Sequence, residues 1–274
     1  TSHRRMLPDF LIIGAPRSGT SALYQYLARH PCIGQAFRGE VSFFDYQFEK
    51  GLDWYRSRFP TLTQKRRVEE RRKFFLSGEA SPNYLFHPAV PGRAAAMLPQ
   101  LKLLVILRNP IDRAYSAYQR EVRKRRDLRP FGEAVQAELP NPFREWNKVR
   151  EQPGYLSQEF VQRSYLARGL YAEQLEWWMK FFPRERFLVI RAEDFFKDAL
   201  LPLNGACNFL GVPRWFDASF RDSLAGRMRA WVQRRYNYNY APLEAPVRSQ
   251  LLEFFRPHNR RLDDLLEMKF NWDK

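Results

Sequence analysis

Short, unbroken apolar runs alternate with longer amphipathic stretches along this chain. Three runs, Phe10–Ile13, Lys102–Leu107 and Phe187–Ile190, have the composition of strands buried on both faces of a parallel sheet. A shorter run, Phe74–Leu76, predicts a further strand. Because helical spacing follows the strand-like runs, the pattern predicts an α/β fold in which helices flank a central parallel sheet.

Apolar residues at helical spacing predict several helices between and after these strands. The expected helices cover Gly51–Pro60, Gln64–Lys73, Arg113–Lys124, Leu200–Leu210 and Ala245–Met268. The segment Pro130–Gln162 has no clear periodicity and contains scattered prolines and charges. It predicts an insertion or lid-like loops, which are often functional at such a length.

The turn after the first apolar run contains two glycines and several hydroxyl groups in the sequence Gly14–Ser21. Apolar residues then recur at helical spacing to Leu27, and the hydroxyls of Ser18 to Ser21 offer N-cap chemistry. A strand, a glycine-containing loop and a helix in this order direct backbone N–H groups and the positive end of a helix onto an anion. The segment therefore predicts an anion-binding loop.

This loop departs from the nucleotide-binding motif GxxxxGK[ST] at its decisive position. Gly14 and Gly19 fit, but Thr20 stands where the motif requires lysine. The cation of the loop is Arg17. The loop is suited to one 5′-phosphate-like group, and a kinase or NTPase that binds ATP with Mg²⁺ is the less favoured alternative.

The segment LPDFLIIGAPRSGTSALYQYL resembles the 5′-phosphosulfate-binding loop of sulfotransferases that use 3′-phosphoadenosine 5′-phosphosulfate (PAPS). A second segment, LKLLVILRNPIDRAYSAY, resembles the strand and helix that bind the 3′-phosphate in that family. The similarity continues through GEVSFFD, GEASPNYLFHP and RPHNRRLDDLLEMKFNWD, and it is strongest to the heparan-sulfate-type domain and its bacterial relatives. It implies a PAPS-dependent sulfotransferase of P-loop-like fold, with residues 1–274 as a single domain.

The resemblance implies two groups of cofactor-binding residues. Arg17, which would also stabilise the leaving group as a catalytic residue, contacts the 5′-phosphosulfate together with Ser18, Gly19, Thr20 and Ser21. Arg108 and Ser116 hold the 3′-phosphate. Arg108 follows a predicted strand at its carboxyl end, where ligands bind in open α/β sheets, and its planar fork suits a phosphate. Asp112 is the expected cap of the helix that follows.

The loop Gln233–Pro242 corresponds to a basic loop that wraps the nucleotide in relatives. Arg234 and Arg235 are its candidate contacts, although the glycine of the family pattern is absent.

Glu40 is the candidate catalytic base. In heparan-type sulfotransferases the glutamate of the corresponding EVxFFD segment takes the proton from the acceptor hydroxyl, and Glu40 matches it. The chain departs from the family at two nearby places: Ser42 stands where histidine is common, and Ala80 stands where a lysine contributes to the sulfate site. These departures leave open a catalytically inactive protein that binds glycosaminoglycan or nucleic acid.

The formal net charge of +16 over 274 residues favours anionic partners. The basic run Glu121–Arg129 extends the cofactor site or follows an acidic polymer. The expected acceptor is an acidic polysaccharide or another hydroxyl-bearing molecule, and no nucleic acid is expected. Trp54 and Tyr55 offer either a sugar platform or core packing. No apolar stretch is long enough to span a bilayer.

Cysteine usage is sparse, with Cys32 and Cys207 far apart in the sequence. Eukaryotic heparan-type relatives carry a cysteine pair in the C-terminal third, where this chain has Cys207 alone. This usage favours a reduced, cytoplasmic setting, with the Golgi lumen as the alternative if an N-terminal anchor has been removed. No Cys/His spacing suits a metal, and no metal is expected.

Overall fold

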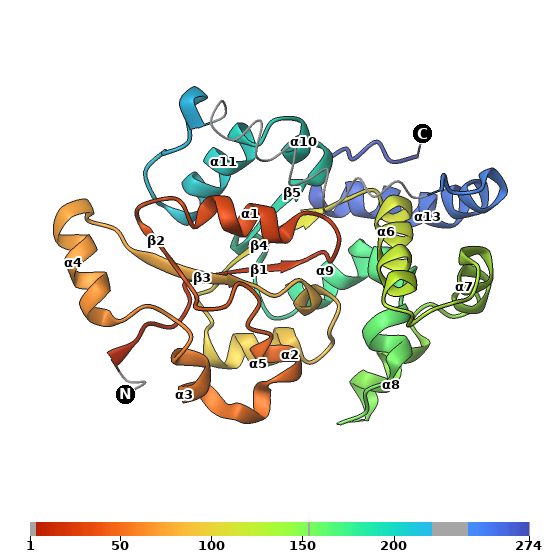
Figure 1. The fold of residues 1–274 in the computed structure, drawn as a ribbon, viewed down its shortest axis with the longest axis horizontal. Helices are drawn as coiled ribbons and strands as arrows, with labels where there is room; N and C mark the ends of the chain where they lie inside the picture. Colours follow the sequence, from red (N-terminus) through yellow and green to blue (C-terminus); the bar gives the residue numbers. More distant parts are fainter. Residues whose placement is uncertain (1–3, 153, 221–240, 274) are drawn as a thin grey trace. The chain divides into compact units, whose positions relative to one another are not determined.

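The computed structural model describes residues 4–152, 154–220 and 241–273. Its five strands form one parallel sheet in the order β2-β3-β1-β4-β5 (Figure 1). The strands are β1 (Phe10–Gly14), β2 (Ile33–Gln35), β3 (Leu76–Ala80), β4 (Lys102–Leu107) and β5 (Phe187–Arg191). The predicted α/β architecture with a central parallel sheet is confirmed.

Strand β1 lies in the middle of the sheet and is buried along its whole length. Its residues Phe10 to Ile13 are fully buried, as expected for a strand covered on both faces. Leu11 pairs with Glu79 of β3 and with Leu103 of β4. Because all the strands are parallel, their carboxyl ends meet at one edge of the sheet.

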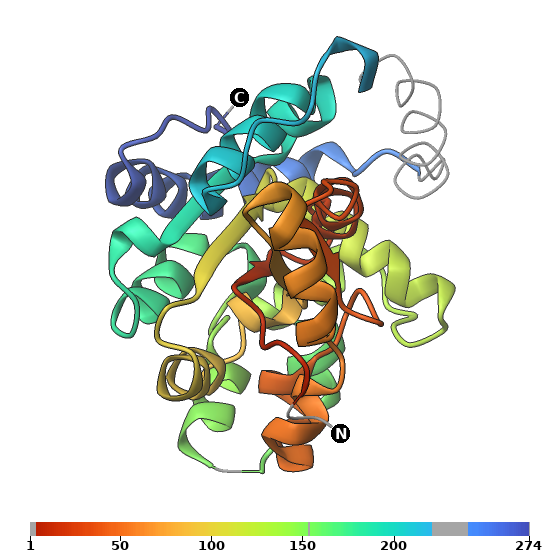
Figure 2. The same ribbon diagram turned by 90° about the vertical axis from the view of Figure 1, so that its left-hand side faces the viewer.

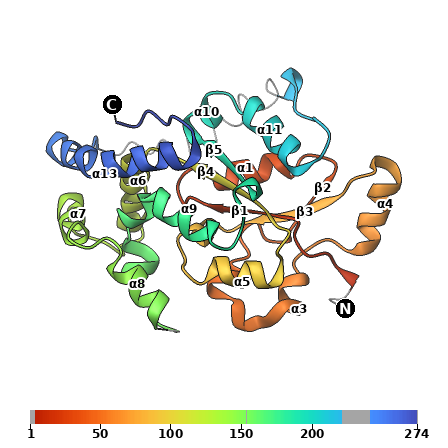
Figure 3. The ribbon, with the colours of Figure 1, turned by 180° about the vertical axis from the view of Figure 1, so that it is seen from behind.

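The described chain divides into two compact units, the first of which contains the whole sheet in residues 4–107 and 178–220. Helices α1 and α11 cover one face of this sheet, and α5 covers the other (Figures 1 and 3). Helix α4 lies beyond the β2 edge of the sheet in Figure 1 and therefore faces the viewer in Figure 2. The α-helices of this unit are α1 (Thr20–Leu27), α2 (Phe43–Tyr46), α3 (Gly51–Arg56), α4 (Leu62–Arg72), α5 (Val90–Met97), α10 (Ala192–Lys197) and α11 (Leu200–Leu210).

Strand β3 begins later than the apolar pattern indicates. The sequence predicts a strand at Phe74–Leu76, whereas β3 runs from Leu76 to Ala80 through serine, glycine and glutamate. A Cβ at Gly78 would lie 2.5 Å from the ring of Phe10, so the close approach of β1 requires glycine there. Tertiary packing, rather than intrinsic strand propensity, fixes this element.

The second unit holds residues 108–152, 154–177 and 241–273, and the described part of it is helical. Its elements are α6 (Pro110–Arg123), α7 (Phe131–Glu138), α8 (Arg144–Glu151), the single π-turn η4 (Glu159–Arg163), the 3₁₀ turn η5 (Ala167–Gly169), most of α9 (Tyr171–Met179) and α13 (Ala245–Leu266). The prediction of lid-like loops over Pro130–Gln162 is therefore wrong. Phe131 and Val135 of α7 pack into the core of this unit with Leu251 and Phe255 of α13, which fixes α7 as a packed element.

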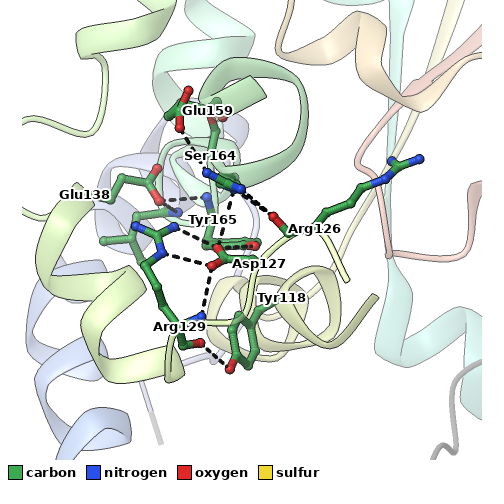
Figure 4. Close-up of polar contacts among 10 residues, drawn as sticks. Tyr118, Arg126, Asp127, Arg129, Glu138, Glu159, Ser164 and Tyr165 are labelled. Atoms are coloured by element: carbon green, nitrogen blue, oxygen red, sulfur yellow. Dashed lines mark hydrogen bonds and ion pairs between the residues drawn. The ribbon is translucent and has the colours of Figure 1, made fainter. Parts of the chain in front are cut away.

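Part of the basic run Glu121–Arg129 is neutralised within the second unit (Figure 4). Asp127 is almost fully buried and accepts hydrogen bonds from Nε and Nη2 of Arg129 at 2.9 and 2.7 Å, and from the Tyr165 hydroxyl at 3.0 Å. Burial opposes ionisation of Asp127, but these hydrogen bonds hold its pKa below the usual range. Buried Glu121 forms ion pairs with Arg120 and Arg126.

Glu138 at the end of α7 anchors a second point of the same network (Figure 4). Its carboxylate accepts the backbone N–H groups of Tyr165, Leu166 and Ala167 at 2.7 to 2.8 Å. The basic run therefore has a structural function. Asp127 of this run binds both Arg129, just before α7, and Tyr165, in the segment before η5.

Candidate active site

The loop after β1 turns the chain sharply into α1. Gly19 has a φ of 109°, a conformation that L-residues with a side chain rarely adopt, and a Cβ there would lie 2.9 Å from Cζ of Phe196. Gly19 itself occupies the N-cap position of α1. The expectation that hydroxyls of Ser18 to Ser21 cap this helix is therefore wrong for the cap residue, because glycine has no side chain.

The uncapped start of α1 is suited to an anion. The Ala22 and Leu23 N–H groups donate to the Gly19 carbonyl at 3.0 Å, whereas the first N–H groups of a helix, here those of Thr20 and Ser21, find no acceptor within it, and the helix dipole makes this end positive. Thr20 is buried and opens the helix, and Ser21 follows it half-buried. Ser18 is fully buried, and its Oγ has no hydrogen-bond partner among the described residues. A buried hydroxyl of this kind fits a ligand oxygen.

Arg17 lies in the same loop with a φ of 70° and a half-buried side chain. The backbone of the loop is held by two hydrogen bonds: Ala15 N–H donates to the Ile106 carbonyl at 2.8 Å, and Ser18 N–H donates to the Ala15 carbonyl at 3.2 Å. The loop is therefore attached to the carboxyl-terminal half of β4 as well as to β1.

Glu40 is exposed in the segment between β2 and α2. The residues on either side of it are held to β3: the Ala80 N–H donates to the Gly39 carbonyl at 3.1 Å, and the Val41 N–H donates to Glu79 Oε2 at 3.1 Å. Since Ile12 of β1 pairs with Ala80, the Glu40 segment and the loop after β1 lie at the carboxyl ends of adjacent strands.

The two departures from the family pattern occupy defined positions beside Glu40. Ser42 has a φ of 53°, and its N–H donates to Ser81 Oγ at 2.8 Å. Ala80 is buried at the end of β3. Neither Ser42 nor Ala80 carries a charge at the positions where the family pattern has histidine and lysine. The cation of the loop after β1 is Arg17.

Asp45 is a further candidate site residue, beyond those that the sequence predicts. It lies in α2 and is buried, with Oδ1 accepting the Tyr46 N–H at 2.7 Å and Oδ2 without a hydrogen-bond partner among the described residues. Burial, with smaller effects of the Glu79 and Glu40 carboxylates, raises the pKa of Asp45 to about 7. Its position five residues after Glu40, directly after Phe43 and Phe44, is a sequence signal that could have identified it.

Arg108 and Ser116 lie in the second unit: Arg108 directly follows β4 and precedes α6 by two residues, and Ser116 lies within α6. Arg108 is half-buried, and its carbonyl accepts the Tyr171 hydroxyl at 2.8 Å; Ser116 is buried. Helix α6 is capped by Asn109, whose Oδ1 accepts the N–H groups of Ile111 and Asp112 at 3.0 and 3.4 Å. The prediction that Asp112 caps the helix is wrong, because its carboxylate forms an ion pair with Arg248 at 3.2 Å.

Arg113 adds a buried charge to the same helix. Its side chain is fully buried, its Nη2 donates to the Tyr165 carbonyl, and its Nε and Nη1 have no hydrogen-bond partner among the described residues. Burial lowers the pKa of Arg113 to about 10, so the group is cationic at neutral pH. It raises the positive potential of the segment that carries Arg108 and Ser116.

Arg234 and Arg235 lie outside the described residues. Tyr55 is fully buried and stacks on Phe43 with ring centroids 4.3 Å apart, which gives it a core position. Trp54 is half-buried between the cations of Lys50 and Arg58, at 4.7 and 4.2 Å from its ring.

His30 has a structural environment. Its Nε2 is 2.9 Å from the Pro213 carbonyl, its Nδ1 accepts the Cys32 N–H at 3.0 Å, and burial lowers its pKa. Across the part of the chain that the structure describes, no group of three or more His, Cys, Asp and Glu side chains is arranged to hold a metal ion. No helix among the described ones is long and apolar enough to cross a membrane.

Comparison with known proteins places these features in a family context. The family profile described as "Sulfotransferase domain" matches residues 7–236. The chain is 30% identical to heparan sulfate glucosamine 3-O-sulfotransferase 6 of Homo sapiens, over 98% of this chain and 75% of that protein. It is 28% identical to bifunctional heparan sulfate N-deacetylase/N-sulfotransferase 2 of Homo sapiens, over 95% of this chain and 29% of that longer protein. The crystal structure of a sulfotransferase from Alicyclobacillus acidocaldarius superposes with a TM-score of 0.69 at 29% identity, covering 98% of this chain and 100% of that one.

Proposed function

The chain belongs to the sulfotransferase domain family, and from this premise we propose that it transfers a sulfuryl group from PAPS to a hydroxyl of a carbohydrate. The donor would supply an activated sulfuryl group and leave as 3′-phosphoadenosine 5′-phosphate. We propose residues 1–274 as one sulfotransferase domain. The alternative, an inactive protein that binds polyanions, is not favoured, because relatives that are named as sulfotransferases match nearly the full chain.

In the proposed site, the loop after β1 binds the 5′-phosphosulfate. The N–H groups at the start of α1, the Ser18 and Thr20 hydroxyls and the Arg17 guanidinium are donors for an anion that gains charge as the S–O bond breaks. These donors are fixed before the ligand arrives, because the loop is hydrogen-bonded to β4 and Gly19 sets its turn. Ser21 completes the hydroxyl set. Arg108 and Ser116 bind the 3′-phosphate, and Arg234 and Arg235 are proposed as further nucleotide contacts.

Glu40 is the proposed general base. A carboxylate that accepts the proton of the attacking hydroxyl lets the new O–S bond form while the bond to the leaving phosphate breaks. Its exposure suits a group that must meet an acceptor from solution. The attachment of Gly39 and Val41 to β3 holds it next to the loop after β1, which is the arrangement that an in-line transfer requires.

For the acceptor we propose an acidic polysaccharide. The net charge of +16 favours an anionic polymer, and the relatives named above are heparan sulfate enzymes. Cys32 and Cys207 are buried free thiols, which agrees with the proposed reducing, cytoplasmic setting.

The observation that carries this proposal is the position of Glu40 and the anion-binding loop at the carboxyl ends of adjacent strands. Glu40→Gln tests it, because glutamine keeps the shape of the side chain and removes the base. We expect sulfate transfer from PAPS to a heparan-type polysaccharide to fall at least about a hundredfold, while calorimetric titration with 3′-phosphoadenosine 5′-phosphate stays as in wild type. Full transfer activity in Glu40→Gln with unchanged nucleotide binding would exclude Glu40 as the base.

A further inference from the structure

A fully buried carboxylate lies beside the Glu40 segment and has no place in the chemistry described so far. Glu79, near the carboxyl end of β3, accepts four hydrogen bonds. Its Oε1 accepts from the hydroxyls of Tyr55 and Tyr84 at 2.9 and 2.8 Å. Its Oε2 accepts from Ser81 Oγ at 2.5 Å and from the Val41 N–H at 3.1 Å.

The Ser81 and Tyr84 hydroxyls, which donate to Glu79, also accept hydrogen bonds from the backbone that follows Glu40. The Ser81 hydroxyl accepts the Ser42 N–H at 2.8 Å. The Tyr84 hydroxyl accepts the N–H groups of Phe43 and Phe44 at 2.7 and 3.2 Å. Together with the direct bond from Val41, four consecutive N–H groups, those of residues 41–44, end on Glu79 or on hydroxyls that Glu79 orients.

We propose that Glu79 is a positioning residue: through the hydroxyls of Ser81 and Tyr84 it fixes the backbone of residues 41–44 and thereby the place of Glu40. This inference rests on the proposed function in so far as Glu40 is the base. The positive φ of Ser42 lies within the fixed segment, so the hydrogen bonds hold a backbone conformation that this sequence would not favour alone.

The chemistry of the group explains why a carboxylate stands here. An ionised carboxylate only accepts hydrogen bonds and offers about four acceptor positions on two oxygens, which matches four donors. The donor set opposes the effect of burial, which raises the pKa of Glu79. A glutamine would turn an NH₂ group toward two of the four donors. An aspartate is one methylene shorter and would not span the same distances.

The two tyrosines provide a matched pair of variants. Both are fully buried, and both donate to Glu79 Oε1. The Tyr84 hydroxyl also accepts two backbone N–H groups of the Glu40 segment, whereas the Tyr55 hydroxyl makes its hydrogen bond to Glu79 alone among the described residues. Tyr84→Phe and Tyr55→Phe therefore each remove one phenolic hydroxyl and one hydrogen bond to Glu79 Oε1. Only Tyr84→Phe also removes the acceptor of the Phe43 and Phe44 N–H groups.

Hydrogen–deuterium exchange of the peptide that contains residues 41–44 tests the positioning without any substrate. We expect exchange of these amides to accelerate by about tenfold or more in Tyr84→Phe and to stay within about twofold of wild type in Tyr55→Phe. Melting temperatures of the two variants are compared to confirm similar stability. Equal exchange in the two variants would overturn the proposal. If Tyr84→Phe does not fold, Ser81→Ala replaces it, with Ser42 as the amide that is expected to exchange faster.

The catalytic consequence is measured on the same variants with PAPS and a heparan-type polysaccharide. Displacement of a base lowers kcat more than nucleotide affinity, so we expect kcat to fall about tenfold in Tyr84→Phe, with little change in Tyr55→Phe and no change in the Kd for 3′-phosphoadenosine 5′-phosphate. Faster exchange with an unchanged kcat would overturn the positioning function of Glu79. Full activity in Glu40→Gln would instead refute the base assignment of the proposed function, and the exchange result would still decide whether Glu79 fixes the segment.

Discussion

Leu11 of β1 and Glu79 of β3 are partners in the parallel sheet. Through this pairing, the loop after β1 and the segment that carries Glu40 lie at the same edge of the sheet, the one formed by the carboxyl ends of the strands. Three residues beyond Leu11, at Gly14, the chain enters the loop that we propose binds the phosphosulfate, and Glu79 accepts the N–H of Val41, the residue after Glu40. We therefore propose that the register of β1 against β3 sets the position of Glu40, the proposed base, relative to the loop after β1.

The first prediction concerns the turn into α1. Gly19→Ala is expected to destabilise the protein by about 1–2 kcal/mol, because alanine is strained at a positive φ, and to weaken binding of 3′-phosphoadenosine 5′-phosphate. The matched control is Gly205→Ala in the exposed face of α11, where a Cβ meets nothing within 4 Å. Gly205→Ala is expected to raise the free energy of unfolding by about 0.5–1 kcal/mol. Chemical denaturation and calorimetry measure both effects; a Gly19→Ala variant that binds and folds like wild type would contradict this description of the loop.

A second prediction separates the structural cap of α6 from the one expected from sequence. Asn109→Ala removes the acceptor of the first helical N–H groups and is expected to lower the free energy of unfolding by about 1 kcal/mol. Asp112→Ala removes a half-exposed ion pair and is expected to cost less than about 0.5 kcal/mol. Urea denaturation of the two variants decides between the caps, and the reverse order of their effects would favour Asp112.

A third prediction concerns the pH dependence of stability. Burial raises the pKa of Asp45 from 3.8 to about 7, so between these values the folded protein binds a proton that the unfolded chain does not. The contribution of Asp45 to stability is therefore greatest at low pH and is lost as the pH rises toward 7. Asp45→Asn cannot ionise, and the variant is expected to be more stable relative to wild type at pH 8 than at pH 4, by up to about 4 kcal/mol, since one pKa unit corresponds to about 1.4 kcal/mol.

Melting temperatures measured from pH 4 to pH 8 test this expectation. Glu138 is also buried and has a raised pKa of about 7, so the comparison uses the difference between Asp45→Asn and wild type at each pH. A difference that does not change with pH would show that Asp45 titrates as an ordinary exposed carboxyl.

Much of the fold could be predicted because its strongest signals are local. The apolar runs of β1, β4 and β5 are buried strands, and Leu200–Leu210 is helical as its spacing indicates. The apolar pattern predicts the start of β3 too early, because the position of this strand depends on Gly78 packing against the ring of Phe10, a contact between residues far apart in the sequence. In the segment Pro130–Gln162, the short apolar face of α7 is completed by α13, and Trp146 of α8 packs on Trp177 of α9.

The candidate site was predictable where a motif carries it and not where three-dimensional packing does. Arg17, Glu40 and Arg108 stand in recognisable sequence contexts. The positioning carboxylate Glu79 has no such context of its own, and the sequence signal of Asp45 is its spacing from Glu40 alone. A single acidic residue in a sequence is more often exposed, so neither side chain is predicted to be buried. Their importance follows from burial and from hydrogen bonds to residues of other elements.

The central claim is that this chain binds a 3′-phosphorylated adenine nucleotide through Arg108. It is tested most directly by calorimetric titration of wild type and Arg108→Ala with 3′-phosphoadenosine 5′-phosphate and with adenosine 5′-phosphate, which lacks the 3′-phosphate. We expect wild type to prefer the 3′-phosphorylated ligand by about tenfold or more and Arg108→Ala to lose that preference, since a fixed guanidinium–phosphate pair supplies it. Equal binding of the two nucleotides by wild type, or an unchanged preference in Arg108→Ala, would contradict the account.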